Sequence, residues 1–232
     1  MTDALNHLRA RTGDALALVR ATRPVLTELD IKVDERTATA VPLLLAALDT
    51  AEAIYALLLQ QPDQYWVAAL VMQRSQMEYV LRAAFFAKAA SQRELMAFRR
   101  TGAMPKRGHR PIHLTAVAEE AGQHLGWDTS KLLSTVRNHQ RDLSGLVHGG
   151  KEVLAIYTQH DAWGDLTVEW GELAHHVDNI AVFTQLALSV AMLLSPLKPD
   201  ALDRAVRAVH GQAMTYFNAN HAGAQTAAPP SH

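Results

Sequence analysis

Apolar residues recur three and four positions apart along most of the chain, and this helical period constrains the fold more than any other feature of the sequence. Such spacing places the apolar side chains of each segment on one face of a helix. No alternation of strands and helices interrupts the pattern, and we find no internal repeat. We therefore predict an all-α protein whose amphipathic helices pack as a multi-helix bundle.

Glycines, prolines and capping residues divide the pattern into separate helices, with a capping box predicted at Ser91 and Glu94 and a later N-cap among Asp128, Thr129 and Ser130. We expect the first helix to weaken at Gly13 and to end near Pro24, and the helix over 112–121 to end at Gly122. The other helices are expected over about 39–60, 64–89, 92–100, 129–147, 170–194 and 200–216. Residues 101–111 hold two glycines and two prolines and are predicted to form a loop, and 152–159 to form a loop or a lone hairpin.

The composition indicates one domain and a tail. The 232 residues show no linker, so residues 1–217 are predicted to form a single helical domain, while 218–232 lack periodicity and are expected to be disordered. A net charge of -1 argues against a uniformly basic nucleic-acid binder. The apolar stretch Ile180 to Leu197 is interpreted as a buried helix rather than a membrane span, and the N-terminus lacks the apolar core of a secretion signal.

The sequence offers little support for metal or cofactor chemistry. The absence of cysteine excludes disulfides and cysteine-ligated metals and is compatible with a cytoplasmic protein. No common nucleotide-binding, zinc-protease or serine-hydrolase motif occurs. Glu172 and His176, helped by Glu169, are the best metal candidate, but acidic residues at a helix N-terminus are more often explained by the helix dipole. We predict no metal and no cofactor.

A polar stripe runs along the helix expected to end at Val147. Arg137, Arg141, Ser144 and His148 are three or four residues apart and share a face. Arg141 and His148 lie about 10 Å apart along the axis, at about 1.5 Å per residue, so both side chains can reach one phosphate. An imidazole can move protons at a ribose hydroxyl or a leaving oxygen, and a guanidinium can hold the phosphate. Alternatively, Arg141 pairs with a buried acid and His148 caps the helix.

Two further charged groups could assist this pair. Arg74, Glu78 and Arg82 are four residues apart inside an apolar helix, where they form either an intrahelical ladder or a network with Arg141 and His148. The loop near residue 105 is basic and is either a phosphate-backbone contact or a solvated loop. Its candidate RNA-binding residues are Arg99, Arg100, Lys106, Arg107 and Arg110, with His109 beside them.

Two segments carry a resemblance to known families. The run from Ala69 to Arg82, followed by Leu143 to Gly150, resembles uncharacterised bacterial helical proteins similar to the DUF6988 and DUF5677 families, which pair an R-x-x-x-E helix with a later H-G-G helix end. Arg141-Asp142 with His148 also looks like the Arg-polar-His signature of the HEPN superfamily. That resemblance implies a HEPN-like bundle in which Arg141 binds and polarises the scissile phosphate. Asp142 would orient Arg141, and His148 would be the general acid or base.

The HEPN resemblance also implies a function and partners. Many such proteins are metal-independent endoribonucleases that act as homodimers in bacterial defence or toxin–antitoxin systems, so RNA and an antitoxin or other partner protein are expected. Other members are inactive scaffolds. The alternative is therefore a non-catalytic helical interaction module in which the Arg, Glu and His side chains are structural, and a small-molecule sensor is a third possibility.

Overall fold

The computed structural model describes residues 2–157 and 168–221 and confirms an all-α bundle with one small hairpin. The elements in chain order are α1 (Thr2–Glu28), α2 (Thr37–Gln60), α3 (Pro62–Ala84), the π-helical turn η1 (Phe85–Ala89), α4 (Gln92–Thr101), β1 (Lys106–Arg107), β2 (Arg110–Pro111), α5 (Leu114–Leu125), α6 (Thr129–Val147), α7 (Lys151–Tyr157), α8 (Trp170–Leu194) and α9 (Pro199–His221).

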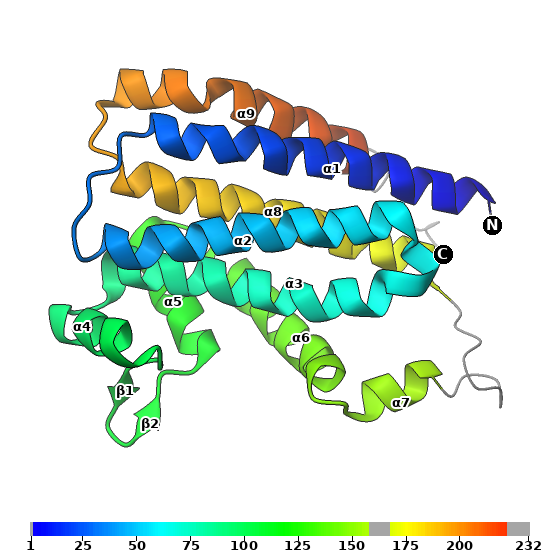
Figure 1. The fold of residues 1–232 in the computed structure, drawn as a ribbon, viewed down its shortest axis with the longest axis horizontal. Coiled ribbons are helices and arrows are strands. Elements are labelled where there is room, and N and C mark those ends of the chain that lie inside the picture. The colour runs from blue at the N-terminus through cyan, green and yellow to red at the C-terminus, as the bar shows by residue number, and fades with distance from the viewer. Residues whose placement is uncertain (1, 158–167, 222–232) are drawn as a thin grey trace, which may run out of the picture.

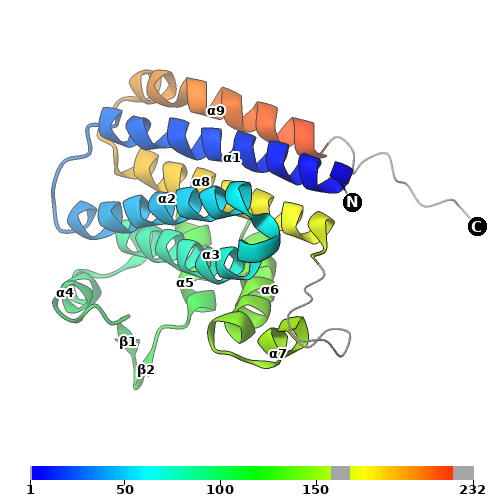
Figure 2. The same ribbon diagram turned by 45° about the vertical axis from the view of Figure 1, so that its right-hand side comes forward.

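The five longest of the described helices lie side by side, and the shorter elements project from one side of this bundle. Figure 1 shows α9 and α1 at the top, α8 and α2 beneath them and α3 below. Below α3, α5 and α6 continue the packing, with α4 and the hairpin at one end and α7 at the other. The turned view in Figure 2 keeps this arrangement, so the basic hairpin and the α6–α7 region share the side of the molecule opposite α9.

The core lies where α2, α3 and α8 meet. On α2, Leu44, Leu48 and Ile54 are fully buried, and on α8 Phe183 and Ala187 are buried four residues apart. By length and composition alone α2 and α8 could cross a membrane, but 56% of the most apolar window of α8 is buried inside the bundle. Burial of this kind supports the interpretation of the α8 stretch as a core helix.

The first helix is longer than its sequence predicts, because α1 runs through Gly13 and Pro24 without ending. A glycine costs about 1 kcal/mol and a proline about 3 kcal/mol inside a helix, whereas each buried leucine or valine contributes about 1.5–3 kcal/mol. Leu8, Leu18 and Val19 of α1 are all buried against the bundle. Tertiary packing therefore outweighs the two breakers, and the prediction that the helix ends near Pro24 was wrong.

The junctions around α4 follow their capping residues. Ser91 and Glu94 form the predicted capping box: the Ser91 hydroxyl accepts from the Glu94 N–H, and the Glu94 carboxylate accepts from the Ser91 N–H. Gly102 ends α4 in the left-handed conformation, with φ of 69°. The loop predicted over 101–111 contains the two-residue strands β1 and β2, in which Lys106 pairs with Pro111.

Gly122 does not end α5, contrary to the expectation. It lies inside α5, which continues to Leu125, and Gly126 provides the left-handed C-cap with φ of 68°. A Cβ on Gly122 would lie 2.8 Å from the Thr129 hydroxyl oxygen at the start of α6. The glycine therefore serves the close approach of α5 and α6 rather than the end of a helix.

The C-terminal third departs from the sequence prediction in two places. Residues 151–157 form α7 instead of the predicted loop or hairpin, because β-branched residues favour strands only where a partner strand is present. Helix α9 continues to His221, so 218–221, expected in the tail, are helical. Residues 158–159 of the predicted loop or hairpin, and 222–232 of the expected tail, lie outside the described residues.

Candidate functional site

Helix α6 presents Arg141 and His148 at its C-terminal half. Asp128 starts the helix by accepting a hydrogen bond from the Lys131 N–H, as predicted. Val136 and Leu143 are buried and hold one face of α6 against the bundle. Arg141 and His148 are both exposed, so the stripe that carries them faces solvent.

The end of α6 is built around His148. Its N–H donates to the carbonyl of Ser144 at 3.0 Å, and the Gly150 N–H donates to the carbonyl of Gly145 at 2.7 Å. Gly149 takes the left-handed conformation, with φ of 67°, that this type of helix end requires. His148 is thus the C-cap residue, as the alternative interpretation proposed, and its ring is nevertheless available to solvent.

Arg141 and His148 are seven residues apart, almost two helical turns, and both are exposed. A guanidinium and an imidazole on one exposed face can hold a phosphate and exchange a proton with a nearby oxygen. Ser144 lies between them in sequence and is half-buried. Asp142 belongs to α6, and its side chain lies outside the described part of the structure.

The charged residues of α3 form the predicted ladder. Glu78 accepts a hydrogen bond from Arg74 at 3.1 Å and another from Arg82 at 2.6 Å. All three side chains are half-buried, and the Nη1 atom of Arg74 is buried without a hydrogen-bond partner. Among the described side chains, the ion pairs of this ladder stay within α3 and do not extend to α6.

Within the basic loop, Arg107 has a structural role. Its guanidinium pairs with Glu94 at 3.0 Å and with both carboxylate oxygens of Glu120, and it lies 5.8 Å from the ring centroid of Phe85. The hydrogen bonds with Glu120 and then Glu94 raise the pKa of Arg107. Its charge is therefore offset within the protein. Arg99, Arg100, Lys106 and Arg110 are exposed and form the basic surface that remains.

Gln73 of α3, His139 of α6 and His176 of α8 form a cluster of polar side chains that the sequence analysis did not predict. The side-chain oxygen of Gln73 lies 2.7 Å from Nδ1 of His176, and the rings of His176 and His139 meet edge to face at 5.7 Å. Gln73 and His139 are both buried. A glutamine in the buried stripe of α3 was the available signal, but its partner lies 103 residues away.

The metal candidate at Glu172 and His176 does not gain a third ligand. Within the described residues, no group of three or more His, Asp or Glu side chains is placed to hold a metal ion. His176 is bonded to Gln73 instead.

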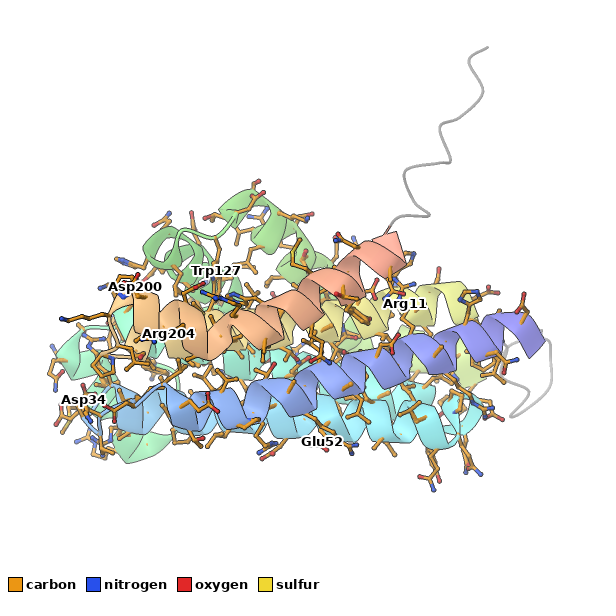
Figure 3. All side chains as sticks on the ribbon, turned by 90° about the horizontal axis from the view of Figure 1, so that it is seen from above. Arg11, Asp34, Glu52, Trp127, Asp200 and Arg204 are labelled. Atoms are coloured by element: carbon orange, nitrogen blue, oxygen red, sulfur yellow. The ribbon has the colours of Figure 1, made fainter. Side chains whose placement is uncertain are left out.

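A buried ionic clamp was also missed by the sequence reasoning. The Asp178 carboxylate on α8 accepts from Arg11 of α1 at 2.7 Å and from the Tyr216 hydroxyl of α9 at 2.7 Å. Figure 3 labels Arg11 in the gap between α1 and α9, above α8. Burial opposes the charge on Arg11, but its bonds to Asp178 outweigh this and raise its pKa. The clamp joins three helices and is a structural feature rather than an exposed reaction centre.

Comparisons with protein-family models, with curated proteins and with solved structures found no match to this chain. A function must therefore be inferred from two features: the exposed Arg141 and His148 near the end of α6, and the exposed basic residues of α4 and the hairpin.

Proposed function

We propose that this chain is a HEPN-like, metal-independent endoribonuclease that acts as a homodimer, with Arg141 and His148 as its catalytic pair. The observation that carries the proposal is the exposure of both side chains on one helix, at and before the end of α6. Burial of either among apolar residues would have removed it from contact with RNA.

The proposed reaction needs only protein groups. His148 accepts the proton of a ribose 2′-hydroxyl while that oxygen attacks the adjacent phosphorus, and the bond from phosphorus to the 5′-oxygen breaks. The leaving 5′-oxygen takes a proton from solvent, and the protonated His148 returns its proton to solvent, so the products are a 2′,3′-cyclic phosphate and a 5′-hydroxyl. Arg141 binds the phosphate oxygens as negative charge develops, and Asp142 is proposed to orient Arg141.

The basic surface supplies a place for the RNA backbone. Arg99, Arg100, Lys106 and Arg110 are exposed on the side of the molecule that also carries α6 and α7. Lysine and arginine contacts to phosphates bind RNA without sequence preference. By the HEPN resemblance, the setting is a bacterial defence or toxin–antitoxin system in which a second protein, such as an antitoxin, restrains the enzyme.

Cleavage of RNA in EDTA tests the proposal. The purified full chain is expected to cut a labelled single-stranded RNA and to leave cyclic-phosphate ends. His148→Ala should lower the rate by about 10²-fold or more, because general acid–base catalysis contributes about 10²–10⁴-fold. Arg141→Lys should retain part of the rate that Arg141→Ala loses, because lysine keeps the charge without the forked geometry.

A matched control separates catalysis from folding. His124 is an exposed histidine on α5, outside the proposed site, and His124→Ala should leave the rate unchanged. Absence of cleavage by the native chain, or cleavage that survives His148→Ala in full, would remove the ribonuclease proposal.

Exposed apolar residues favour a second candidate, a non-catalytic interaction or scaffold module. Val147 at the end of α6 and Leu154 and Tyr157 on α7 are 39%, 63% and 42% exposed. Exposed apolar side chains on two elements in contact with each other are typical of a protein-binding surface. On this reading Leu154→Glu would abolish capture of the partner protein and His148→Ala would not, whereas the ribonuclease requires His148 for turnover.

A further inference from the structure

The charges of the chain are divided between two parts of the molecule. Residues 88–157, from the end of η1 through α7, hold eleven lysines and arginines and six aspartates and glutamates, a formal charge of +5. The rest of the chain holds eleven lysines and arginines and seventeen aspartates and glutamates, a formal charge of -6. The basic segment contains the elements that lie on the side opposite α9 (Figure 2). This side can therefore attract a polyanion although the net charge of the chain is negative.

Arg137 is an exposed cation within this basic segment. It forms no ion pair with a described residue. It belongs to the solvent-facing stripe of α6 that also carries Arg141 and His148, and it precedes Arg141 by four residues. Four residues span about 6 Å along the helix axis, at about 1.5 Å per residue, so the two arginines are neighbours on adjacent turns.

Arg137 and Arg141 lack the acidic neighbour that the arginines of α3 have. On α3, Glu78 lies four residues from both Arg74 and Arg82 and accepts a hydrogen bond from each. On α6, the positions three and four residues away from Arg137 and from Arg141 hold no aspartate or glutamate. Like charges four residues apart destabilise a helix. A bound phosphate would remove this repulsion by supplying the negative charge that the helix itself does not.

Neutral hydrogen-bonding groups surround Arg137 on the same stripe. Ser134 precedes it by three residues, and Asn138 follows it and precedes Arg141 by three. Both side chains are exposed, and neither forms a hydrogen bond with a described residue. A hydroxyl and an amide can contact phosphate and ribose oxygens without adding charge. The stripe therefore offers a strand of RNA both cations and neutral donors upstream of the Arg141 and His148 pair.

We infer that Arg137 binds a second phosphate of the RNA, next to the phosphate that Arg141 holds. The inference rests on the proposed ribonuclease function, since Arg141 and His148 define the phosphate at which the strand is cut. The fork of a guanidinium suits two phosphate oxygens, and a flexible single strand can bring successive phosphates to adjacent helical turns. The substrate class is then a single-stranded oligonucleotide with a phosphate beside the scissile one. A dinucleotide that has only the scissile phosphate lacks this second contact.

Cleavage of short RNAs that differ by one terminal phosphate tests the inference. The dinucleotide XpY has the two bases found at the cleavage site of a longer RNA, pXpY adds a 5′-phosphate, and XpYp adds a 3′-phosphate. With the native chain, kcat/KM for one of the two phosphorylated substrates should exceed that for XpY about tenfold, because an arginine–phosphate contact of about 1.4 kcal/mol corresponds to that factor. In Arg137→Ala the ratio should fall to about one, and Arg137→Lys should keep part of it.

Lys131→Ala is the matched control. Lys131 is also an exposed cation of α6 without an ion pair to a described residue, but it lies about a third of a turn around the helix from Arg137. Its loss should leave the ratio as in the native chain. Both alanine variants should fold, because the side chains they remove are exposed and alanine favours the helix, and circular dichroism checks this.

Binding of uncleavable probes separates this inference from the ribonuclease proposal. Calorimetry with 2′-O-methyl UpU, with and without a terminal phosphate, measures the gain in affinity from that phosphate in the absence of turnover. A gain that Arg137→Ala removes, in a chain that cuts no RNA, would support the two-phosphate site and remove the ribonuclease. Cleavage with the same ratio in the native chain and Arg137→Ala, for both phosphorylated substrates, would overturn the inference and keep the ribonuclease. An equal fall of the ratio in Lys131→Ala would also overturn it, since the effect would then be diffuse attraction.

Discussion

At the scale of single residues, Asp178 is a buried charge whose surroundings constrain the stability of the fold. Its carboxylate is buried, and it is satisfied from two other helices by Arg11 and Tyr216. A charge in such a place is tolerated only while its partners remain, because removal from water costs several kcal/mol per ion. The three residues therefore act as one unit that fixes α1 and α9 on α8.

Removing only one partner of this pair should be more harmful than replacing both. Arg11→Met leaves the Asp178 charge buried without its cation, and we expect a loss of about 2–4 kcal/mol in the free energy of unfolding, reduced from the full cost because Arg11 is partly exposed. Arg11→Met with Asp178→Leu should recover much of that loss. Urea denaturation measures all three chains, and a double variant less stable than Arg11→Met would contradict the account.

Tyr216 gives the clamp a signature at high pH. Burial, followed by the nearby negative charge of Asp178, raises the pKa of Tyr216 above its usual value of about 10. Above pH 10 the unfolded chain therefore loses this proton while the folded chain keeps it, so stability falls as pH rises, by up to about 1.4 kcal/mol per pH unit. Tyr216→Phe should be less stable at pH 7, because a hydrogen bond is lost, and should show a shallower decline between pH 10 and 11.5. Equal slopes in denaturation experiments would disprove this assignment.

At the scale of elements, the contact between α5 and α6 depends on a missing side chain. Gly122 lies inside α5, where alanine would be favoured by up to about 1 kcal/mol. A Cβ there would lie 2.8 Å from the Thr129 hydroxyl oxygen and 3.4 Å from two carbons of the same side chain. Thr129 is the first residue of α6. A side chain at position 122 would therefore push away the start of the helix that carries Arg141.

Two glycine-to-alanine substitutions should therefore have opposite effects. Gly122→Ala is expected to lower the free energy of unfolding by about 1–2 kcal/mol, because overpacking costs about 1–3 kcal/mol and helix propensity returns up to about 1. Gly13→Ala has nothing within 4 Å of its Cβ and should raise stability by up to about 1 kcal/mol. Thermal denaturation compares them, and adding Thr129→Ala to Gly122→Ala should restore stability. Stabilisation by Gly122→Ala alone would show that the contact is not close.

At the scale of the whole molecule, local signals predicted the helices well, and contacts distant in sequence were not predictable. The capping box at Ser91 and the start of α6 at Asp128 depend on neighbours in sequence, so their patterns could be read. The length of α1 and the helical state of 151–157 depend on packing against other helices, which spacing does not reveal. Gln73 and His176 are 103 residues apart in the sequence, and Arg11 and Asp178 are 167 residues apart. Both contacts therefore depend on how distant helices pack against one another.

The overall charge leads to a last prediction about RNA binding. With a net charge of -1, the chain can attract a phosphate backbone only where its basic residues are locally unpaired. Arg99, Arg100, Lys106 and Arg110 are exposed, whereas Arg107 is held by Glu94 and Glu120. For single strands, each neutralised phosphate contributes about 0.7 to the slope of log affinity against log salt concentration. Replacing the four exposed residues by glutamine should therefore lower the magnitude of that slope by up to about 2.8.

The same titration with Arg107→Gln distinguishes a structural arginine from an RNA contact. This variant should leave the salt slope nearly unchanged and instead loosen the hairpin, because Glu94 and Glu120 lose their common partner. Faster amide hydrogen exchange at 103–112 would report that loosening. A slope that falls as much with Arg107→Gln as with any one of the exposed residues would mean that Arg107 leaves its carboxylates to bind RNA. A slope unaffected by the fourfold change would place the RNA on another surface.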